Sequence, residues 1–512
     1  MISIKARTLF ILMIVAITLS CGRNRLKMDE KALIKQISAE EETLAQQEAI
    51  RTKQEMNSTN SSLKLPEGIK FKEWRKADPQ KPPVEIDIAE SLTNITNKKL
   101  SDVASNITYI RFDPVPEQTF PRNLKFKYFL MDNYIVAANI YGIFLYSKDG
   151  KFIRTIVRNQ TKGIEYDEKR NQILIWNDYS LIGGWNSIWG IGNNLYYNYK
   201  NNITGENYIM MFDCSKAQST TNPISNSEKE KQITGLGQIL IDLNHGQTKP
   251  PAPREHLGMS TVTPESIYQD IDVFAPDSTT YINKMWGKNM WGIFGRQGDT
   301  LTTFSKLEKS VDYTKSRETD RGIQYEMQGN LFFRSNFNDT IFQVIPPNRI
   351  NPVYVLKLGR YKVSKKEGID PDFNLSGKII PQDWAETKSY LFLTFTMDSY
   401  DCPYNRKNKS VKIYHAIFSK ANLQLQVIKS DPTDYSAPIL ENNIDGGCPV
   451  WPQSYMIGNK GEIASSLKGH ELKSKVLSNQ FQKSTASAEK KEKLKRLSDS
   501  ITDQDDILMI VE

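Results

Sequence analysis

The stretch that decides the fold is YFLMDNYIVAANIYGIFLYSKDGKFIRTI, residues 128–156. Aromatic and aliphatic residues dominate it, and such residues suit the half-buried surface of a β-sheet. Asp149-Gly150, within SKDGK, supplies the turn of a β-hairpin, because glycine adopts the backbone angles that a tight hairpin turn needs. The stretch therefore predicts two strands around this turn.

Similar strand pairs recur along the chain, whereas no run of strands alternates with amphipathic helices, which disfavours a parallel α/β sheet. Repeated hairpins predict an all-β fold, a six-bladed β-propeller over residues 84–467. Six blades would average about 64 residues, more than the roughly 40–50 of common propeller repeats, so we expect insertions at 215–262, 308–323 and 362–386. The recurring segments are NQILIWND (171–178), NNLYYNY (193–199), WGIFGRQGDTLTTF (291–304), GNLFFRSNFNDTIFQVI (329–345), VKIYHAIFSKANLQLQVI (411–428) and SYMIGNKGEIASSL (454–467).

The start of the chain predicts an exported lipoprotein. Lys5 and Arg7 precede an apolar stretch that is too short to span a bilayer but is typical of a secretory signal over residues 1–20. The stretch ends in Leu-Ser-Cys-Gly, which resembles a bacterial lipobox with Cys21 as the acylated residue. An ordinary signal peptide with a chance cysteine is the alternative. Acyl chains such as palmitate would anchor the protein to the cell envelope.

The segments that flank the propeller are expected to be helical. Residues 21–83 form a spacer and linker, in which 29–57 lack Gly and Pro and are rich in helix formers. A partly ordered spacer is the alternative. Residues 468–512 predict a C-terminal helical extension that packs on the propeller and ends in a short apolar segment.

The chain resembles the uncharacterised six-bladed β-propeller lipoproteins of gut-dwelling Gram-negative anaerobes. The resemblance covers roughly residues 98–512, and NQTKGIEYDE (159–168) departs from it, because relatives tend toward a Gly-Pro-rich loop. It implies the propeller fold and an outer-membrane address, and it implies no established activity. The matching stretches are LSDVASNITYIRF, FLYSKDGKFIRTI, GNLFFRSNFNDTIFQV, YVLKLGRYKV, NNIDGGCPVWP and DDILMIVE.

Tryptophans beside glycines are candidate ligand platforms, since such rings stack on sugars or peptide side chains, although propeller cores also use tryptophan. NNIDGGCPVWP adds Asp445 and Trp451; here the glycine turn and the two prolines favour a rigid loop of the closing blade, with a ligand-facing role as the minor alternative. The candidate ligand-binding residues are Trp185, Trp189, Trp286, Trp291, Asp445 and Trp451.

Two cysteines, Cys402 and Cys448, lie in irregular segments that flank one hairpin, so they could form a disulfide in an exported protein. Asp-Ser/Thr-aliphatic sequences resemble an O-glycosylation signal of some anaerobes, and simple turn chemistry is the alternative. The candidate O-glycosylation residues are Ser278, Thr300, Thr340 and Ser500.

Catalysis and metal binding have no clear signature. The four histidines, His245, His256, His415 and His470, lack the spacing of metal ligands, so we expect no metal and no cofactor. A pair of acidic residues for glycoside hydrolysis cannot be recognised without the fold. No histidine is marked as a base for cysteine catalysis.

The sequence therefore favours a non-catalytic envelope module that binds or scaffolds an unknown glycan, peptide or protein. A propeller-type lyase or glycoside hydrolase that uses acidic residues at the channel mouth is the first alternative. An accessory subunit of an outer-membrane nutrient transporter is the second. The net charge of +8 comes from interspersed basic and acidic residues, which argues against a nucleic-acid-binding face.

Overall fold

A computed structural model provides the fold. The chain separates into two units, residues 1–65 and 66–512. The structure describes residues 78–512 apart from several gaps, so the expected signal peptide, Cys21 and spacer helix lie outside the described residues. The gaps are 79, 117–125, 140–141, 159–162, 168–171, 177–187, 201–206, 218–237, 243–258, 263–272, 275, 277–278, 285–288, 296–299, 306–322, 336, 371, 399–411, 429–438, 454–455 and 459.

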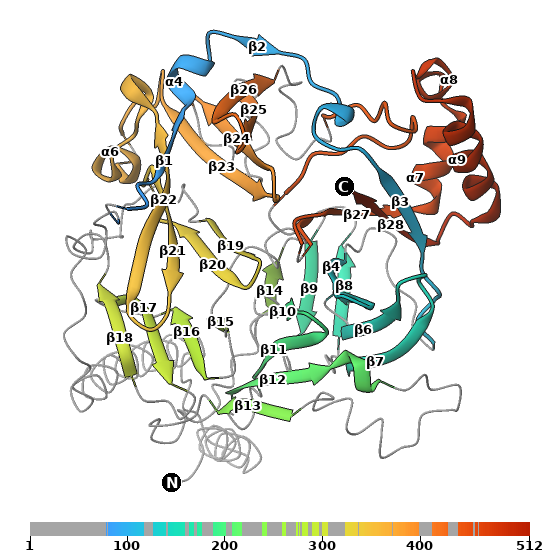
Figure 1. Ribbon diagram of the computed structural model, residues 1–512, viewed down its shortest axis with the longest axis horizontal. Coiled ribbons are helices and arrows are strands. Elements are labelled where there is room, and N and C mark those ends of the chain that lie inside the picture. Colours follow the sequence, from blue (N-terminus) through green and yellow to red (C-terminus); the bar gives the residue numbers. More distant parts are fainter. Residues whose placement is uncertain are drawn as a thin grey trace, which may run out of the picture. The chain divides into compact units, whose positions relative to one another are not determined.

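The described part consists mostly of β-strands in several small sheets, with few helices (Figure 1). The first three sheets are antiparallel meanders of consecutive strands. Sheet 1 contains β4 (Lys127–Leu130), β5 (Tyr134–Asn139), β6 (Gly142–Ser147) and β7 (Phe152–Arg158). Sheet 2 contains β10 (Ile188–Ile191), β11 (Asn194–Lys200), β12 (Asn207–Asp213) and β13 (Gln238–Asp242). Sheet 3 contains β15 (Val273–Phe274), β16 (Thr280–Lys284), β17 (Asn289–Gly295) and β18 (Thr300–Ser305).

Two five-stranded sheets follow, and each adds one N-terminal strand in parallel to the edge of an antiparallel meander. Sheet 4 contains β19 (Ile323–Met327), β20 (Asn330–Arg334), β21 (Thr340–Ile345), β22 (Arg349–Lys357) and the added β1 (Val84–Asp87). Sheet 5 contains β23 (Ile379–Glu386), β24 (Tyr390–Met397), β25 (Lys412–Ser419), β26 (Gln424–Ile428) and the added β2 (Ile95–Thr96).

Two three-stranded sheets complete the set. The closing sheet combines both ends of the described chain: β3 (Ile107–Arg111), β27 (Ile463–Lys468) and β28 (Asp506–Val511). A side sheet contains β8 (Gly163–Asp167), β9 (Gln172–Trp176) and β14 (Met259–Val262).

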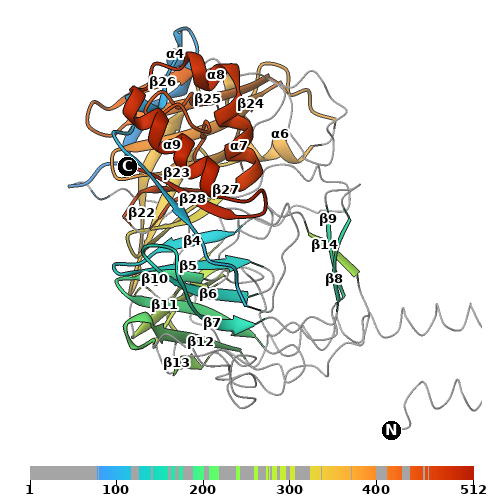
Figure 2. The same ribbon diagram turned by 90° about the vertical axis from the view of Figure 1, so that its right-hand side faces the viewer.

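The helices are short, and those near the C-terminus follow one another closely. The α-helices are α4 (Ile88–Ser91), α6 (Lys365–Ile369), α7 (Gly469–Leu477), α8 (Asn479–Lys483) and α9 (Ala488–Ser500), and the 3₁₀ turns are η1 (Leu100–Asp102), η2 (Cys214–Lys216) and η5 (Gly359–Tyr361). Figure 2 shows α7, α8 and α9 beside β27 and β28, and one apolar cluster joins these elements.

The hairpin predicted at SKDGK is confirmed as the turn between β6 and β7. Gly150 has a φ of +87°, and its amide donates to the carbonyl of Ser147 at 3.0 Å. A Cβ at Gly150 would lie 2.1 Å from the carbonyl oxygen of Arg111, in β3. The glycine is therefore required both for the turn and for the close approach of sheet 1 to the closing sheet.

Each of the six main sheets packs on the next in chain order. The turn before β5 in sheet 1 bonds to the β10–β11 turn of sheet 2, where Asp132 N donates to the carbonyl of Gly192 at 3.2 Å. Three apolar clusters join sheets 2, 3 and 4, then sheets 4 and 5, then sheet 5 and the closing sheet. A further cluster joins the closing sheet to sheet 1.

The expected C-terminal extension is not helical throughout. After α9 the chain returns as β28, which lies between β27 and β3 and pairs antiparallel with both. The physical reason is the apolar run DILMIV, which is buried on both faces as a central strand of a sheet must be. The short apolar end is thus a sheet element.

Two expected insertions also contain strands. β13 and β14 lie within 215–262, and β23 begins within 362–386. The third, 308–323, lies almost entirely outside the described residues.

Candidate functional site

The loop ENNIDGGCPVWP at 441–452 is mostly buried, and the side chain of Asn442 organises it. Asn442 Oδ1 accepts from the amides of Ile444 (3.1 Å) and Asp445 (3.2 Å). Its Nδ2 donates to Asp445 Oδ1 (2.7 Å) and to the carbonyl of Cys448 (3.3 Å). One amide side chain therefore fixes four groups of the loop, which explains how an irregular segment satisfies its buried polar atoms.

The two glycines of this loop are needed for different reasons. Gly446 has a φ of +83°, and a Cβ there would lie 2.5 Å from Ser484 Oγ. Gly447 faces Tyr109 of β3, whose hydroxyl oxygen would lie 2.4 Å from a Cβ. Gly446 thus permits the turn, and Gly447 leaves room for the tyrosine hydroxyl.

Trp451 ends the loop inside the core and is 3% exposed. Its Nε1 donates to Thr394 Oγ1 at 2.9 Å. Its ring makes edge contacts with Phe392 and His415, at centroid distances of 5.5 and 4.7 Å. This position supports the rigid-loop interpretation and does not support the alternative in which Trp451 contacts a ligand.

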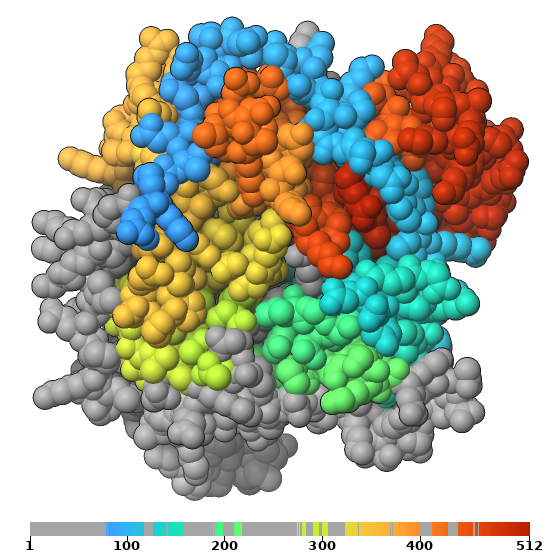
Figure 3. Space-filling view, viewed as in Figure 1, coloured from blue at the N-terminus to red at the C-terminus, as the bar shows by residue number. Residues whose placement is uncertain are grey.

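A cavity of about 230 Å³ lies between β3, the 441–452 loop and α9. Figure 3 shows the segments that form it, light blue for β3 and red for the C-terminal helices, side by side on one face. Its lining mixes apolar and polar side chains, as is typical of small-ligand sites. The lining residues are Asn106, Ile107, Thr108, Tyr109, Ile444, Asp445, Lys490, Lys493, Leu494 and Leu497.

Asp445 and Tyr109 are the buried polar groups of the cavity. Asp445 is 7% exposed, and its Oδ1 also accepts from the amide of Gly447 at 2.8 Å. The Tyr109 hydroxyl is buried and has no hydrogen-bond partner within the described part of the chain. Burial and the nearby charge of Asp445 raise the pKa of Tyr109 well above its ordinary value, so the hydroxyl keeps its proton.

Asp445 is the one residue here that sequence reasoning had singled out. Tyr109, Asn442, Lys490 and Lys493 were missed. The only signal for Tyr109 was its place in the strand LSDVASNITYIRF, where an aromatic residue is ordinary. The lysines belong to a charged helix in which most positions look alike. Only the fold brings β3 and α9 together.

A second group of interest is the pair Lys127 and Glu326, from β4 and β19. Both side chains are partly exposed, and the charge of each affects the other. Desolvation lowers the pKa of Lys127 to about 8, although the negative charge of Glu326 acts to raise it. It raises the pKa of Glu326 to about 7, although the Gly329 amide donates to Glu326 Oε1 at 2.6 Å. Groups with pKa values near neutrality can exchange protons at physiological pH.

Glu386 is a buried carboxylate with a structural role. It accepts from Tyr354 Oη at 2.8 Å and from Tyr325 Oη, and it pairs with Lys420 Nζ at 2.6 Å. These partners come from sheets 4 and 5, so the cluster ties the two sheets together. A buried ion pair whose polar atoms are all hydrogen-bonded favours one arrangement of the two sheets over others.

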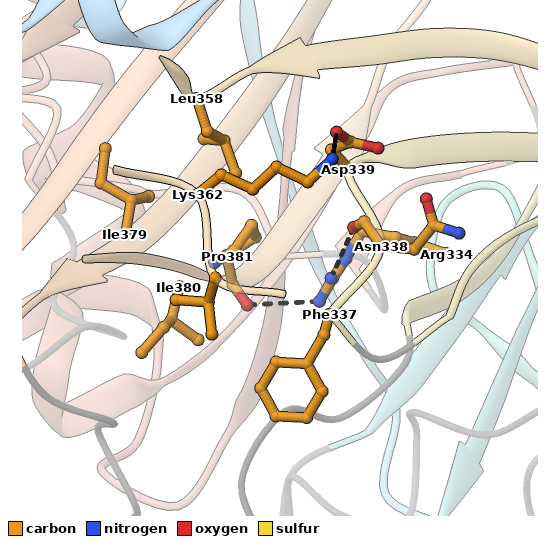
Figure 4. A pocket seen from close by; sticks show the side chains of 10 residues that line it. Arg334, Phe337, Asn338, Asp339, Leu358, Lys362, Ile379, Ile380 and Pro381 are labelled. Carbon is orange, nitrogen blue, oxygen red and sulfur yellow. Dashed lines mark hydrogen bonds and ion pairs between the residues drawn. The ribbon is translucent and has the colours of Figure 1, made fainter. Parts of the chain in front are cut away.

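Arg334, which is 1% exposed, lies beside a cavity of only about 10 Å³ (Figure 4). Its guanidinium donates to the carbonyls of Asn338 (3.0 Å) and Pro381 (3.4 Å), while Lys362 pairs with Asp339 at 2.5 Å. A cavity of this size holds about one water at most. The group is therefore a polar link between sheets 4 and 5.

Of the four tryptophans predicted to be ligand platforms, the structure describes the side chain of Trp291 alone. Trp291 is 1% exposed and packs in the cluster of sheets 2–4, so a ligand contact at this residue is not supported. Its ring contacts Phe333 at 5.6 Å, as a core residue would. Trp189 lies in β10, but its side chain is outside the described residues, as are Trp185 and Trp286.

Cys448 carries a free, buried thiol, which does not support the possible bridge to Cys402. Because Cys402 lies outside the described residues, the pairing stays a prediction. Burial raises the pKa of the Cys448 thiol to about 12, so it is not a nucleophile at neutral pH.

The O-glycosylation candidates also stay predictions. Thr300 and Thr340 begin β18 and β21 and are half-buried, and Ser500 is exposed at the end of α9. Ser278 lies outside the described residues.

Within the described part of the chain, no group of three or more His, Cys, Asp and Glu side chains could hold a metal ion. His415 is buried against Trp451, and His470 is exposed in α7. His245 and His256 lie outside the described residues. In the same described part, no helix is both long and apolar enough to cross a membrane.

Residues 66–478 match a family model whose description is "Domain of unknown function (DUF4933)". The chain belongs to this family. The match spans sheets 1 to 5, β3, β27 and α7, and it ends before α8, α9 and β28. The cavity of this DUF4933 member is therefore built partly from residues beyond the matched range. No curated protein matches the chain.

Several solved structures are similar to the chain at low identity. One is a protein from Bacteroides fragilis that is described as exported: it is 10% identical, with a TM-score of 0.43, over 84% of this chain and 99% of that chain. A DUF4221 member from Bacteroides vulgatus is 10% identical, with a TM-score of 0.37, over 80% and 97%. The virginiamycin B lyase of Staphylococcus aureus is 10% identical, with a TM-score of 0.26, over 65% and 90%.

Proposed function

We propose that this chain is a lipid-anchored binding module of the cell envelope, built on a six-bladed β-propeller. Cys21 carries the acyl chains, sheets 1 to 5 and the closing sheet are the blades, and the cavity beside the closing sheet takes a small ligand.

Two observations support the propeller. The six main sheets follow one another in chain order, each packed on the next, and the closing sheet packs on both sheet 5 and sheet 1. In a six-membered ring, sheets 1 and 4 are opposite. Lys127 of sheet 1 and Glu326 of sheet 4 nonetheless interact electrostatically, which fits two residues that face a common axial channel.

The sequence supports the envelope address, because a basic segment, an apolar core and a lipobox precede Cys21. The test is Cys21→Ala in the native host. The wild-type protein should sediment with membranes, and the variant should appear in the soluble fraction. A variant that stays with the membranes would rule out the lipid anchor.

The observation that carries the binding role is the 230 Å³ cavity. A ligand that binds only the folded state increases the free energy of unfolding, by about 2.7 kcal/mol at a concentration 100 times its Kd. The melting temperature therefore rises. The test is a thermal-shift screen of the full chain against sugars, amino acids and short peptides. Leu497→Trp, which fills the cavity, should abolish the shift. Leu477→Trp, at a side chain that is 83% exposed, is the control.

If no compound shifts the melting temperature, or if the shift survives in Leu497→Trp, the cavity is not the binding site. Capture of a membrane transport complex in a pull-down from the native envelope would instead favour the accessory-subunit alternative.

One observation favours a second candidate function, a propeller-type lyase. The pKa values of Lys127 and Glu326, about 8 and about 7, suit general acid–base catalysis near neutral pH. Turnover of an acidic glycan that is lost in Glu326→Gln, with an unchanged melting temperature, would establish it.

A further inference from the structure

The ligand class of the cavity follows from an imbalance of charge at its floor. Asp445 is buried, and it forms no ion pair within the described part of the chain. Its hydrogen bonds from the Asn442 side chain and the Gly447 amide both reach Oδ1. Oδ2 is thus available to a ligand. A buried carboxylate without a counter-charge is costly, so a cationic donor at Oδ2 would stabilise it more than a neutral one.

Tyr109 adds a second unused group at the same place. Its hydroxyl is buried beside Asp445 and Asn442, and it forms no hydrogen bond of good geometry within the described residues. A phenol oxygen can accept an N–H bond from a ligand. Because Gly447 has no side chain, this hydroxyl can lie against the backbone of the loop, beside Asp445. An ammonium group bound there would donate to both Asp445 and Tyr109.

The rim of the cavity has the opposite charge. Lys490 and Lys493 are both exposed, and both line the cavity. They are three residues apart in α9, so they lie on one face of the helix. Leu494 and Leu497 of the same helix, with Ile107 of β3, provide an aliphatic wall. The cavity therefore offers an anion at the floor, cations at the rim and an apolar side.

We propose that the cavity binds a small zwitterion, an aliphatic α-amino acid or a dipeptide with such a side chain. The ligand's ammonium lies at Asp445 and Tyr109, its carboxylate at Lys490 and Lys493, and its side chain against Leu494 and Leu497. The volume of about 230 Å³ is below the roughly 300–1,000 Å³ of drug-sized pockets, which fits a ligand of this size. This inference rests on the proposed binding function and names its ligand.

The test is calorimetric titration of the full chain with four matched compounds. L-Leucine and alanyl-leucine carry both charges. Leucinamide lacks the carboxylate, and 4-methylpentanoate lacks the ammonium. We expect leucine or alanyl-leucine to bind at least tenfold more tightly than either truncated compound. Glucose and glucuronate, titrated in parallel, should not bind.

Three variants test which residues bind the ammonium and the carboxylate of the ligand. Asp445→Asn keeps the hydrogen bonds at Oδ1 but removes the charge, so the preference for leucine over 4-methylpentanoate should disappear. The double variant Lys490→Gln/Lys493→Gln changes only exposed side chains, so folding is preserved and the preference over leucinamide should disappear. Lys495→Gln, on α9 but outside the lining, is the control and should bind as the wild type does.

The outcomes separate this inference from the proposed function. If a sugar binds and is excluded by Leu497→Trp, the binding function stands and the zwitterion class is wrong. If leucine binds but both charge variants retain the preferences, the assignment of the two ends is wrong. If neither leucine nor alanyl-leucine binds, the inference is overturned, and the wider thermal-shift screen decides the binding function.

Discussion

Gly446 is a single residue at which backbone conformation and packing act together. Its φ of +83° disfavours any side chain, and the space that a Cβ would need is taken by Ser484 and Phe481. A substitution here therefore forces the loop away from α8. The loss would reach the cavity, because the same loop carries Asp445.

We expect Gly446→Ala to lower the free energy of unfolding by about 2–4 kcal/mol, from backbone strain plus steric displacement. Urea denaturation measures the change. Gly377→Ala is the matched control: its φ is +70°, but nothing lies within 4 Å of a Cβ. It should cost about 1 kcal/mol, from strain alone. Equal losses in the two variants would show that packing against α8 contributes nothing.

The pair Lys127 and Glu326 makes stability depend on pH. The pKa of Glu326 rises from 4.5 to about 7 in the folded state, so that state holds a proton that the unfolded chain releases. Stability then falls as pH rises from 4.5 to 7. The pKa of Lys127 falls from 10.5 to about 8, so stability rises again between pH 8 and 10.5.

Glu326→Gln should remove the fall between pH 5 and 7, by about 1–2 kcal/mol after allowance for partial exposure. Chemical denaturation at several pH values gives the profile. Glu489→Gln, at an exposed site on α9, is the control and should retain the wild-type slope. A wild-type profile that is flat from pH 5 to 7 would contradict the shift at Glu326.

Among the elements, α9 is part of the core as well as a wall of the cavity. Leu494 is 3% exposed and packs in the cluster shared with sheet 5 and the closing sheet. The helix is short and highly charged, so tertiary packing of its narrow apolar stripe accounts for most of its stability.

Leu494→Ala should lower the free energy of unfolding by about 2–5 kcal/mol, as for other buried leucines. Leu477→Ala, at the exposed end of α7, should change it by less than about 0.5 kcal/mol. Thermal and urea unfolding of both variants provide the comparison. Similar values for the two would mean that α9 does not pack as described.

The hairpin elements were the most predictable part of the fold. Asp149-Gly150, the aromatic strands and the turns between them act locally, and local turn chemistry can be read from neighbouring residues. The strand β28 was missed because an apolar run after a charged helix has no local partner. It becomes a strand only beside β3, about 400 residues earlier in the chain.

The candidate site was less predictable for the same reason. NNIDGGCPVWP marked the loop and Asp445, because glycines and prolines signal special backbone geometry. The cavity itself depends on contacts between β3, the loop and α9, which no local pattern encodes. Trp291 was a candidate platform, and a ligand-facing role was the minor alternative for Trp451. Both rings lie in the core, since burial depends on the face of the strand or loop that meets a neighbouring sheet.

For the whole molecule, the closing sheet is the element that unites the two ends of the described chain. β28 pairs with β3 and β27, and the carbonyl of Glu512 also accepts from the amides of Ser105 (2.7 Å) and Asn106 (3.0 Å). Loss of this strand exposes the clusters on both sides of the sheet.

Deletion of residues 506–512 should abolish cooperative unfolding, with loss of the near-ultraviolet circular dichroism signal and aggregation. Replacement of Glu512 by alanine, which keeps the backbone hydrogen bonds, should leave both signals unchanged. A truncated protein that still unfolds in one sharp transition would show that the closing sheet is dispensable.

The place of β28 also has a consequence for biosynthesis. A ribosome adds about 5–20 residues per second, so the synthesis of β3 precedes that of its partner strand β28 by on the order of 20–80 s. Until then this region has no complete sheet, and the nascent chain stays open. The apolar clusters on the two sides of this sheet can therefore be completed only after residues 506–511 have been made.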